Sequence, residues 1–334
     1  MGGASVSANS GIQVDYDEKR YLLDPKGPVQ ADFTFVSHAH IDHIHQPRGD
    51  ERILASKETQ QLAQARGYDL GDAMQQVEGV DLLDSGHILG SRAIRVADEV
   101  LYTGDAAGRA RAFLGKCRTR RARILIMETT YGNPEYLFPP TAKLVKGVHT
   151  LISESFDKGK PVVLMGYPLG KAQLLTYFFS TWSPFYVHES VARMNDIHRM
   201  NNVELRKGKV IDPFTVRDGD ISPGPWLMVA PMMGSRNRFL ARLKKDHGAV
   251  TVAFSGWATN DGYRFSMGAD YAFPLSDHCD YAELMRLVQE VSPEVVYTTH
   301  GFAQEFARDL RRVGFTARTI SAYQSSLFDY VKGD

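Results

Sequence analysis

Short apolar runs, each followed by a glycine or a polar residue, recur along most of the chain. In the first half, runs rich in β-branched and aromatic residues predict buried strands at 12–14, 21–23, 32–36, 53–55, 100–105 and 124–128. From residue 161 onward, predicted strands alternate with helical segments, a pattern typical of a mostly parallel sheet with helices on its faces. The strands of this region are expected at 161–165, 186–188, 226–230 and 250–254, and its helices near 170, 191–200 and 235–246.

The remaining segments complete this pattern. Ser56 is a good N-cap for a helix that ends near Gly67. A strand pattern resumes after Gly262, and the last elements are expected to be a helix, a strand, a helix and a strand at 281–291, 295–298, 303–313 and 317–321. Residues 1–11 are small and polar without the apolar core of a signal peptide, so we expect a disordered tail.

Composition narrows the possibilities only a little. The chain has 334 residues, enough to bury a large core and to form more than one domain. Its formal net charge is zero, so only local patches could hold a polyanion. No apolar run approaches the length that crosses a membrane. Cys117 and Cys279 do not make a disulfide framework, so we expect a cytoplasmic protein.

Four side chains that can bind a metal follow the predicted strand at 32–36 within six positions: His38, His40, Asp42 and His43. Imidazole and carboxylate are ligand types that Zn²⁺ prefers. The alternative is a polar loop with ordinary histidines. The His-x-His-x-Asp-His spacing favours the metal site, because later segments offer further ligands of the same types.

These further candidates also lie beside glycines or at strand ends. His87 lies in a loop with glycines on both sides, and Asp105 ends a strand with the sequence Gly-Asp. One carboxylate can bridge two cations about 3.5–4 Å apart, as in two-metal hydrolases. Glu128, His278 and His300 follow at the ends of later predicted strands. Asp24 follows the strand at 21–23, where it could either orient a metal ligand or cap a turn.

Basic residues gather after Asp105, between positions 109 and 123. Such a run is either a solvated helical face or a contact for a phosphate backbone. Lys171 opens a predicted helix whose free N–H groups could hold a phosphate. The candidate phosphate or nucleic-acid contacts are Lys171, Ser235, Arg109 and Arg111.

The order of these candidate ligands along the chain, His-x-His-x-Asp-His, then His, then Asp, then His, resembles that of the metallo-β-lactamase superfamily. The stretches at 128–132, 276–278 and 299–301 resemble the three additional motifs of its β-CASP nucleases. The resemblance implies an α/β fold of the α+β kind, an αββα sandwich with an inserted βα domain. Residues 12–132 and 262–334 would form the metallo-β-lactamase domain and residues 133–261 the inserted β-CASP domain, marked at its start by Asn133-Pro134 and Pro139-Pro140.

The family resemblance also implies roles for the ligands. His38, His40 and His87 would bind one Zn²⁺, and Asp42, His43 and His300 a second, with Asp105 bridging and Asp24 supporting from outside the ligand set. Mn²⁺ is the alternative metal. The residues expected to take part in catalysis are His278, Glu128 and Asp42. His278, oriented by Glu128, would be the general acid beside the scissile phosphate, while the two ions activate water.

The implied function is a zinc-dependent nuclease that acts on DNA or RNA. Residues 267–278 and the Thr-His-Gly stretch look most like the small ligase-associated DNA exonucleases, which favours DNA repair and association with a DNA ligase or helicase. A histidine at position 300 is also typical of RNA-processing members of the mRNA 3′-end type, so it does not decide the substrate. Two other classes are weighed: a small-molecule metallo-hydrolase, which has no use for Glu128 and His278, and a non-catalytic nucleic-acid-binding subunit, in which missing ligands would be expected.

Overall fold

The computed structural model describes residues 3–8, 11–27 and 30–320, and these form two compact units. Unit 1 contains the described residues up to Ala110, then Leu114–Leu137, then those from His278 onward. Unit 2 contains Phe138–Asp277 together with the short piece Arg111–Phe113. Chain continuity alone therefore makes unit 2 an insertion into unit 1.

The first sheet of unit 1 begins with antiparallel strands and ends with parallel ones. Its order is β1-β2-β3-β4-β5, with β3, β4 and β5 parallel. The helix α1 (Lys57–Ala65) follows β5 and is capped by the Ser56 side chain, as the sequence predicts. The strand bounds are β1 (Ser5–Ala8), β2 (Ile12–Tyr16), β3 (Lys19–Leu23), β4 (Phe33–Phe35) and β5 (Ile53–Leu54).

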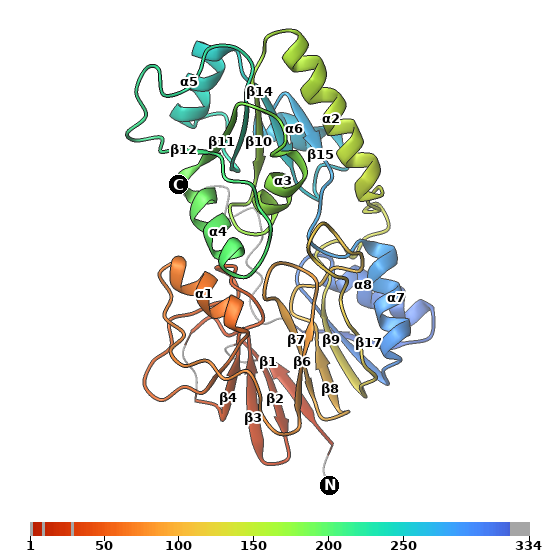
Figure 1. Ribbon diagram of the computed structural model, residues 1–334. Coiled ribbons are helices and arrows are strands. Elements are labelled where there is room, and N and C mark those ends of the chain that lie inside the picture. The colour runs from red at the N-terminus through yellow and green to blue at the C-terminus, as the bar shows by residue number, and fades with distance from the viewer. Residues whose placement is uncertain (1–2, 9–10, 28–29, 321–334) are drawn as a thin grey trace. The chain divides into compact units, whose positions relative to one another are not determined.

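The second sheet of unit 1 has the order β17-β16-β9-β8-β7-β6, in which β8, β9, β16 and β17 are parallel. Two helices of unit 1, α7 (Tyr281–Val291) and α8 (Ala303–Arg312), flank β16 in the sequence and pack beside this sheet (Figure 1). The strands are β6 (Val80–Asp84), β7 (Arg92–Val96), β8 (Val100–Tyr102), β9 (Ile124–Glu128), β16 (Val295–Thr299) and β17 (Thr316–Thr319).

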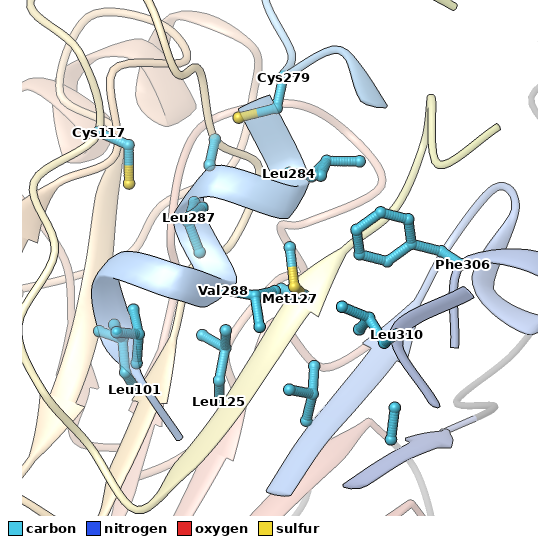
Figure 2. Packing of buried hydrophobic residues seen from close by; sticks show 14 of the residues in the cluster. Leu101, Cys117, Leu125, Met127, Cys279, Leu284, Leu287, Val288, Phe306 and Leu310 are labelled. Atoms are coloured by element: carbon cyan, nitrogen blue, oxygen red, sulfur yellow. The ribbon is translucent and has the colours of Figure 1, made fainter. Parts of the chain in front are cut away.

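Alternation along β9 shows how this sheet builds two cores. Ile124 and Ile126 pack in a cluster with residues of the first sheet, so the two sheets face each other. Leu125 and Met127 point the other way and meet α7 and α8, as Figure 2 shows. The result is helices on one sheet and a second sheet behind it, the α/β sandwich that the sequence predicts.

Unit 2 is built on a parallel sheet of order β12-β11-β13-β10-β14-β15. One face packs against α2 and α3, and the other packs against α5. The strands are β10 (Val162–Gly166), β11 (Phe185–His188), β12 (Lys209–Ile211), β13 (Leu227–Pro231), β14 (Val250–Phe254) and β15 (Tyr271–Phe273). The helices are α2 (Thr141–Asp157), α3 (Lys171–Phe179), α4 (Glu189–Met200), α5 (Arg238–His247) and α6 (Asp261–Met267).

Two stretches differ from the expectation. The expected disordered tail contains a strand, β1, because Val6 can pair with Val14 of β2 across an antiparallel register. The segment after Gly262 forms α6 and then β15, and β15 pairs with β14 in the sheet of unit 2. The proposed insertion boundaries at 133 and 261 stay a prediction, and Ser321, the predicted end of the last strand, lies outside the described residues.

Candidate metal centre

The ends of parallel strands bring distant residues of unit 1 together. Asp105 follows β8 by three residues, Glu128 is the last residue of β9, and His300 follows β16. Glu128 and Thr299 are register partners, so the last two of these ends lie at one edge of the sheet. His38 follows β4 of the facing sheet in the same way. Side chains at such ends converge without a specific loop fold.

Asp105 lies at the centre of a first group of possible ligands. Its Oδ2 lies 3.4 Å from His38 Nε2 and 3.6 Å from His87 Nε2. His87 Nε2 in turn lies 3.1 Å from His40 Nδ1. One donor atom from each of these four residues fits within 4.8 Å of the others, so the group could hold a metal ion.

A second group meets the first at Asp105. His43 Nε2 lies 3.5 Å from Asp105 Oδ2 and 3.6 Å from Asp42 Oδ2. The rings of His43 and His300 are 5.6 Å apart between centroids. Asp42, His43 and His300 also line one small cavity together with Asp24. Asp105 therefore faces both groups, as a bridging carboxylate must.

Asp24 supports this second group from a buried position. Its Oδ2 accepts hydrogen bonds from His43 Nδ1 at 2.8 Å and from the Tyr102 hydroxyl at 2.8 Å. Ser37 donates both its N–H and its hydroxyl to the same carboxylate. Of the two alternatives for Asp24, the geometry favours orientation of an imidazole, because the His43 ring is fixed with Nε2 toward Asp105.

Unpartnered nitrogens and shifted pKa values mark the centre as a place for a cation. His38 Nε2 and His300 Nδ1 are buried without a hydrogen-bond partner among the described residues. Burial lowers the pKa of His38 well below its usual range and that of His300 to about 4, so both rings are neutral and can offer a lone pair. Burial raises the pKa of Asp105 to about 7. The donor set fits divalent metal ions on these grounds.

His278 and Glu128 form a separate pair beside this cluster. His278 Nδ1 lies 2.8 Å from Glu128 Oε1 and 4.0 Å from Asp105 Oδ2. Glu128 is fully enclosed, and its Oε2 accepts the Thr130 N–H at 2.9 Å. Burial alone would raise the pKa of Glu128, but His278 and these hydrogen bonds lower it. An ionised Glu128 stabilises a protonated His278 and fixes the direction of its ring.

Three of the four candidate phosphate contacts, Lys171, Arg111 and Arg109, have protein partners in the structure. Lys171 is buried, and its Nζ donates to the Leu275 carbonyl and to Asp277. Arg111 is also buried and donates to the Ser276 carbonyl. The ammonium group of Lys171 is thus not presented to solvent, because a buried carboxylate in the same unit needs its charge. Arg109 is bound to two carboxylates, and Ser235 is exposed in unit 2.

Sequence reasoning missed three residues at the centre. Ser37 and Tyr102 hold Asp24, and Lys26 donates to the carbonyl oxygen of Asp42. Lys26 and Tyr102 line the same small cavity as His300. Ser37 lies next to the ligand His38, which is a usable signal. No sequence signal points to Tyr102, because it lies 78 positions from Asp24.

No family model matches the chain, but comparison with individual proteins gives clear similarities. A protein named probable DNA ligase from Opitutus terrae is 35% identical over 303 residues, covering 86% of this chain and 28% of the relative. An RNase J-like protein from Methanocaldococcus jannaschii is 28% identical over 383 residues, covering 90% of this chain and 91% of that protein. The chain thus corresponds to less than a third of the first relative and to nearly all of the second.

A solved structure supports the fold. The crystal structure of a protein of unknown function from Enterococcus faecalis V583 superimposes with a TM-score of 0.64 at 14% identity. The match covers 97% of this chain and 99% of that one. In the part of the chain that the structure describes, none of the helices combines the length and the apolar character needed to cross a membrane.

Proposed function

Because the chain belongs to the β-CASP family of the metallo-β-lactamase superfamily, we propose that it is a divalent-metal-dependent nuclease. It hydrolyses phosphodiester bonds of nucleic acid and leaves 5′-phosphate and 3′-hydroxyl ends. The observation that carries this proposal is the pairing of His278 with the buried Glu128, 2.8 Å apart, beside a cluster of side chains that could hold a metal ion. A hydrolase of small lactams or thioesters has no need of that pair.

Two Zn²⁺ ions are the expected cofactors, with Mn²⁺ as the alternative. We assign His38, His40 and His87 to one ion and Asp42, His43 and His300 to the other, with Asp105 between them. Bound ions of this kind lower the pKa of water and neutralise charge on the phosphoryl oxygens. Asp24 contributes by accepting the Nδ1–H of His43, which leaves Nε2 of that ring for the metal.

His278 is the proposed general acid. Glu128 accepts its Nδ1–H, which leaves the Nε2–H to protonate the departing 3′ oxygen. The departing 3′ alkoxide is a strong base, so its release without a proton would cost much free energy. A proton delivered as the P–O bond breaks removes most of that cost. The same Glu128 is held by the Thr130 and Ala106 N–H groups, so the imidazole is aimed before substrate binds.

DNA is the preferred substrate, acted on as an exonuclease in repair. The preference for DNA is based on the similarity of most of this chain to part of a protein named probable DNA ligase. We propose that the chain acts together with a DNA ligase for the same reason. RNA processing is the second candidate, and the similarity to an RNase J-like protein over nearly its whole length favours it.

Matched single-stranded DNA and RNA of one sequence, with a label at either end, test the proposal. We expect zinc-dependent shortening of DNA that a chelator abolishes and added metal restores, with 5′-phosphorylated products. If only the RNA is degraded, the substrate is RNA and the proposed DNA substrate is wrong. If the fully metal-bound protein cuts neither substrate, the proposed nuclease activity is wrong.

A further inference from the structure

An arginine joins the loop after Asp105 to the first turn of α7. We call Arg109, Asp280 and Glu283 the Arg109 clamp. Arg109 Nε donates to Glu283 Oε1 at 2.7 Å, and its Nη2 donates to Asp280 Oδ2. Both carboxylates are buried. Two buried carboxylates within one turn are costly without a compensating cation, and Arg109 supplies it through a forked contact.

The two carboxylates also cap the helix, each with its other oxygen. Asp280 Oδ1 accepts the Glu283 N–H at 2.9 Å, and Glu283 Oε2 accepts the Asp280 N–H at 3.0 Å. This capping box satisfies the start of α7 locally. Arg109 adds a connection that the box lacks, to a loop 171 positions away in the sequence. The start of the helix is thereby fixed in place as well as capped.

Ala106 of the same loop contacts Glu128 and Cys279, the residue after His278. The Cys279 N–H donates to the Ala106 carbonyl at 2.7 Å, and the Ala106 N–H donates to Glu128 Oε1 at 3.2 Å. A Cβ on Gly108 would lie 2.7 Å from the Glu283 Cβ, so loop and helix are in close contact. Cys279 itself is anchored in the core beside Leu284 (Figure 2).

We propose that Arg109 is a positioning residue for His278. By holding Asp280 and Glu283 against the Asp105 loop, it fixes the segment from which His278 reaches Glu128. The imidazole therefore keeps one place relative to Asp105, and a displacement of about 1 Å can cost about 10²-fold in rate. This role rests on the nuclease activity proposed above.

The test compares two substrates that differ in their need for an acid. Arg109→Ala and Arg109→Lys are assayed with zinc bound on a DNA oligonucleotide and on bis(p-nitrophenyl) phosphate, whose leaving group needs no proton. We expect kcat on the oligonucleotide to fall about 10- to 100-fold for Arg109→Ala, with KM and zinc content unchanged. On bis(p-nitrophenyl) phosphate, kcat should fall by less than about twofold. Arg109→Lys should recover part of the loss, because it keeps the charge but lacks the fork.

Arg123→Ala is the matched control, since it removes an ion pair with Glu99 elsewhere in unit 1. It should leave both substrates unaffected. Adding Arg109→Ala to His278→Ala should cause no further loss, because both changes act on one proton transfer. Equal losses on both substrates, loss of zinc, or additive losses in the double variant would overturn the proposal.

A second measurement separates this proposal from the proposed function. If the wild-type protein cuts neither DNA nor RNA, the nuclease fails, but the clamp can still be judged by amide hydrogen exchange. Arg109→Ala should then speed exchange at Cys279 and Glu283 relative to Arg123→Ala. Unchanged exchange at these amides would overturn the positioning role whatever the activity.

Discussion

The histidines of the metal centre differ in what the second nitrogen of each ring contacts. Nδ1 of His43 meets the Asp24 carboxylate, and Nδ1 of His38 meets the Ser37 hydroxyl at 2.9 Å. Both rings then direct Nε2 toward Asp105. His278 Nδ1 also meets a carboxylate, that of Glu128, but here the same Nδ1 is the nitrogen that lies 4.0 Å from Asp105 Oδ2. The orientation toward Asp105 therefore distinguishes His38 and His43, the proposed metal ligands, from His278, the proposed proton donor.

Alanine at His278 and at His87 should therefore have different effects. His278→Ala should keep its full metal content while turnover on oligonucleotide falls about 10²–10⁴-fold, because only the proton donor is lost. His87→Ala should lose metal, since its Nε2 faces Asp105 and His40. Metal content and turnover rate, measured for both purified variants, test these two expectations. Equal loss of metal in the two variants would contradict the role of His278.

Lys171 shows why some residues could be placed from sequence and others could not. The ligands were predictable because they follow apolar strand runs, and strand ends converge. The partner of Lys171 is Asp277, 106 positions away, and no local pattern reveals such a pair. The same holds for Arg109, whose carboxylates lie on a helix much later in the chain. The sequence predicts both residues as phosphate contacts, and it does not show the carboxylates that each of them binds in the structure.

Loss of the Lys171 charge should be costly to stability. Lys171→Met leaves Asp277 buried without its cation, so we expect the free energy of unfolding to fall by about 3–5 kcal/mol. The double variant Lys171→Met with Asp277→Leu should recover most of that loss, because neither charge is then buried. Urea unfolding of the three proteins measures both effects. If the free energy of unfolding of Lys171→Met lies within about 1 kcal/mol of the wild-type value, the Lys171–Asp277 pair is not needed for stability.

At the scale of elements, the strands with β-branched runs were predictable and the polar or poorly capped elements were not. Strand β6 is a half-exposed edge strand with two aspartates, and β7 beside it carries two arginines, so neither has a clear apolar run. Helix α2 has Pro140 as its N-cap, without a side-chain capping hydrogen bond, and contains Gly147, so its helical signal is weak. Pairing of β15 with β14 depends on a neighbour that sequence does not show.

The turn between β16 and α8 requires glycine at position 301. Gly301 has φ +54°, and a Cβ there would lie 2.5 Å from Thr130 Cα and 2.7 Å from the Thr129 carbonyl oxygen. Gly301→Ala should therefore lower the free energy of unfolding by about 2–4 kcal/mol, adding a backbone clash to the left-handed strain. It should also weaken metal binding, since His300 is the preceding residue. Thermal unfolding and metal titration test both.

Gly49→Ala is the control for that change. Gly49 has a similar φ of +62° in the same unit, but nothing lies within 4 Å of its Cβ position. It should cost only about 1 kcal/mol, the strain of the left-handed conformation. Equal losses at the two glycines would mean that Thr129 and Thr130 shift freely, and that the turn does not fix His300.

At the scale of the whole molecule, the candidate centre belongs to one unit although its residues span positions 24 to 300. The chain leaves unit 1 after Leu137 and returns at His278, so the proposed general acid is the first residue after the insertion. Sequence could predict that later histidines join the early ones. It could not give the point of return, because β15 and Asp277 are held by contacts inside unit 2.

Diffraction at the zinc absorption edge from crystals of the zinc-loaded protein tests the central claim most directly. We predict two anomalous peaks about 3.5–4 Å apart, one at His38, His40 and His87 and the other at Asp42, His43 and His300. Asp105 should lie between them. Peaks elsewhere, or no peak among these side chains at full zinc occupancy in solution, would contradict a metal centre built from residues 38 to 300.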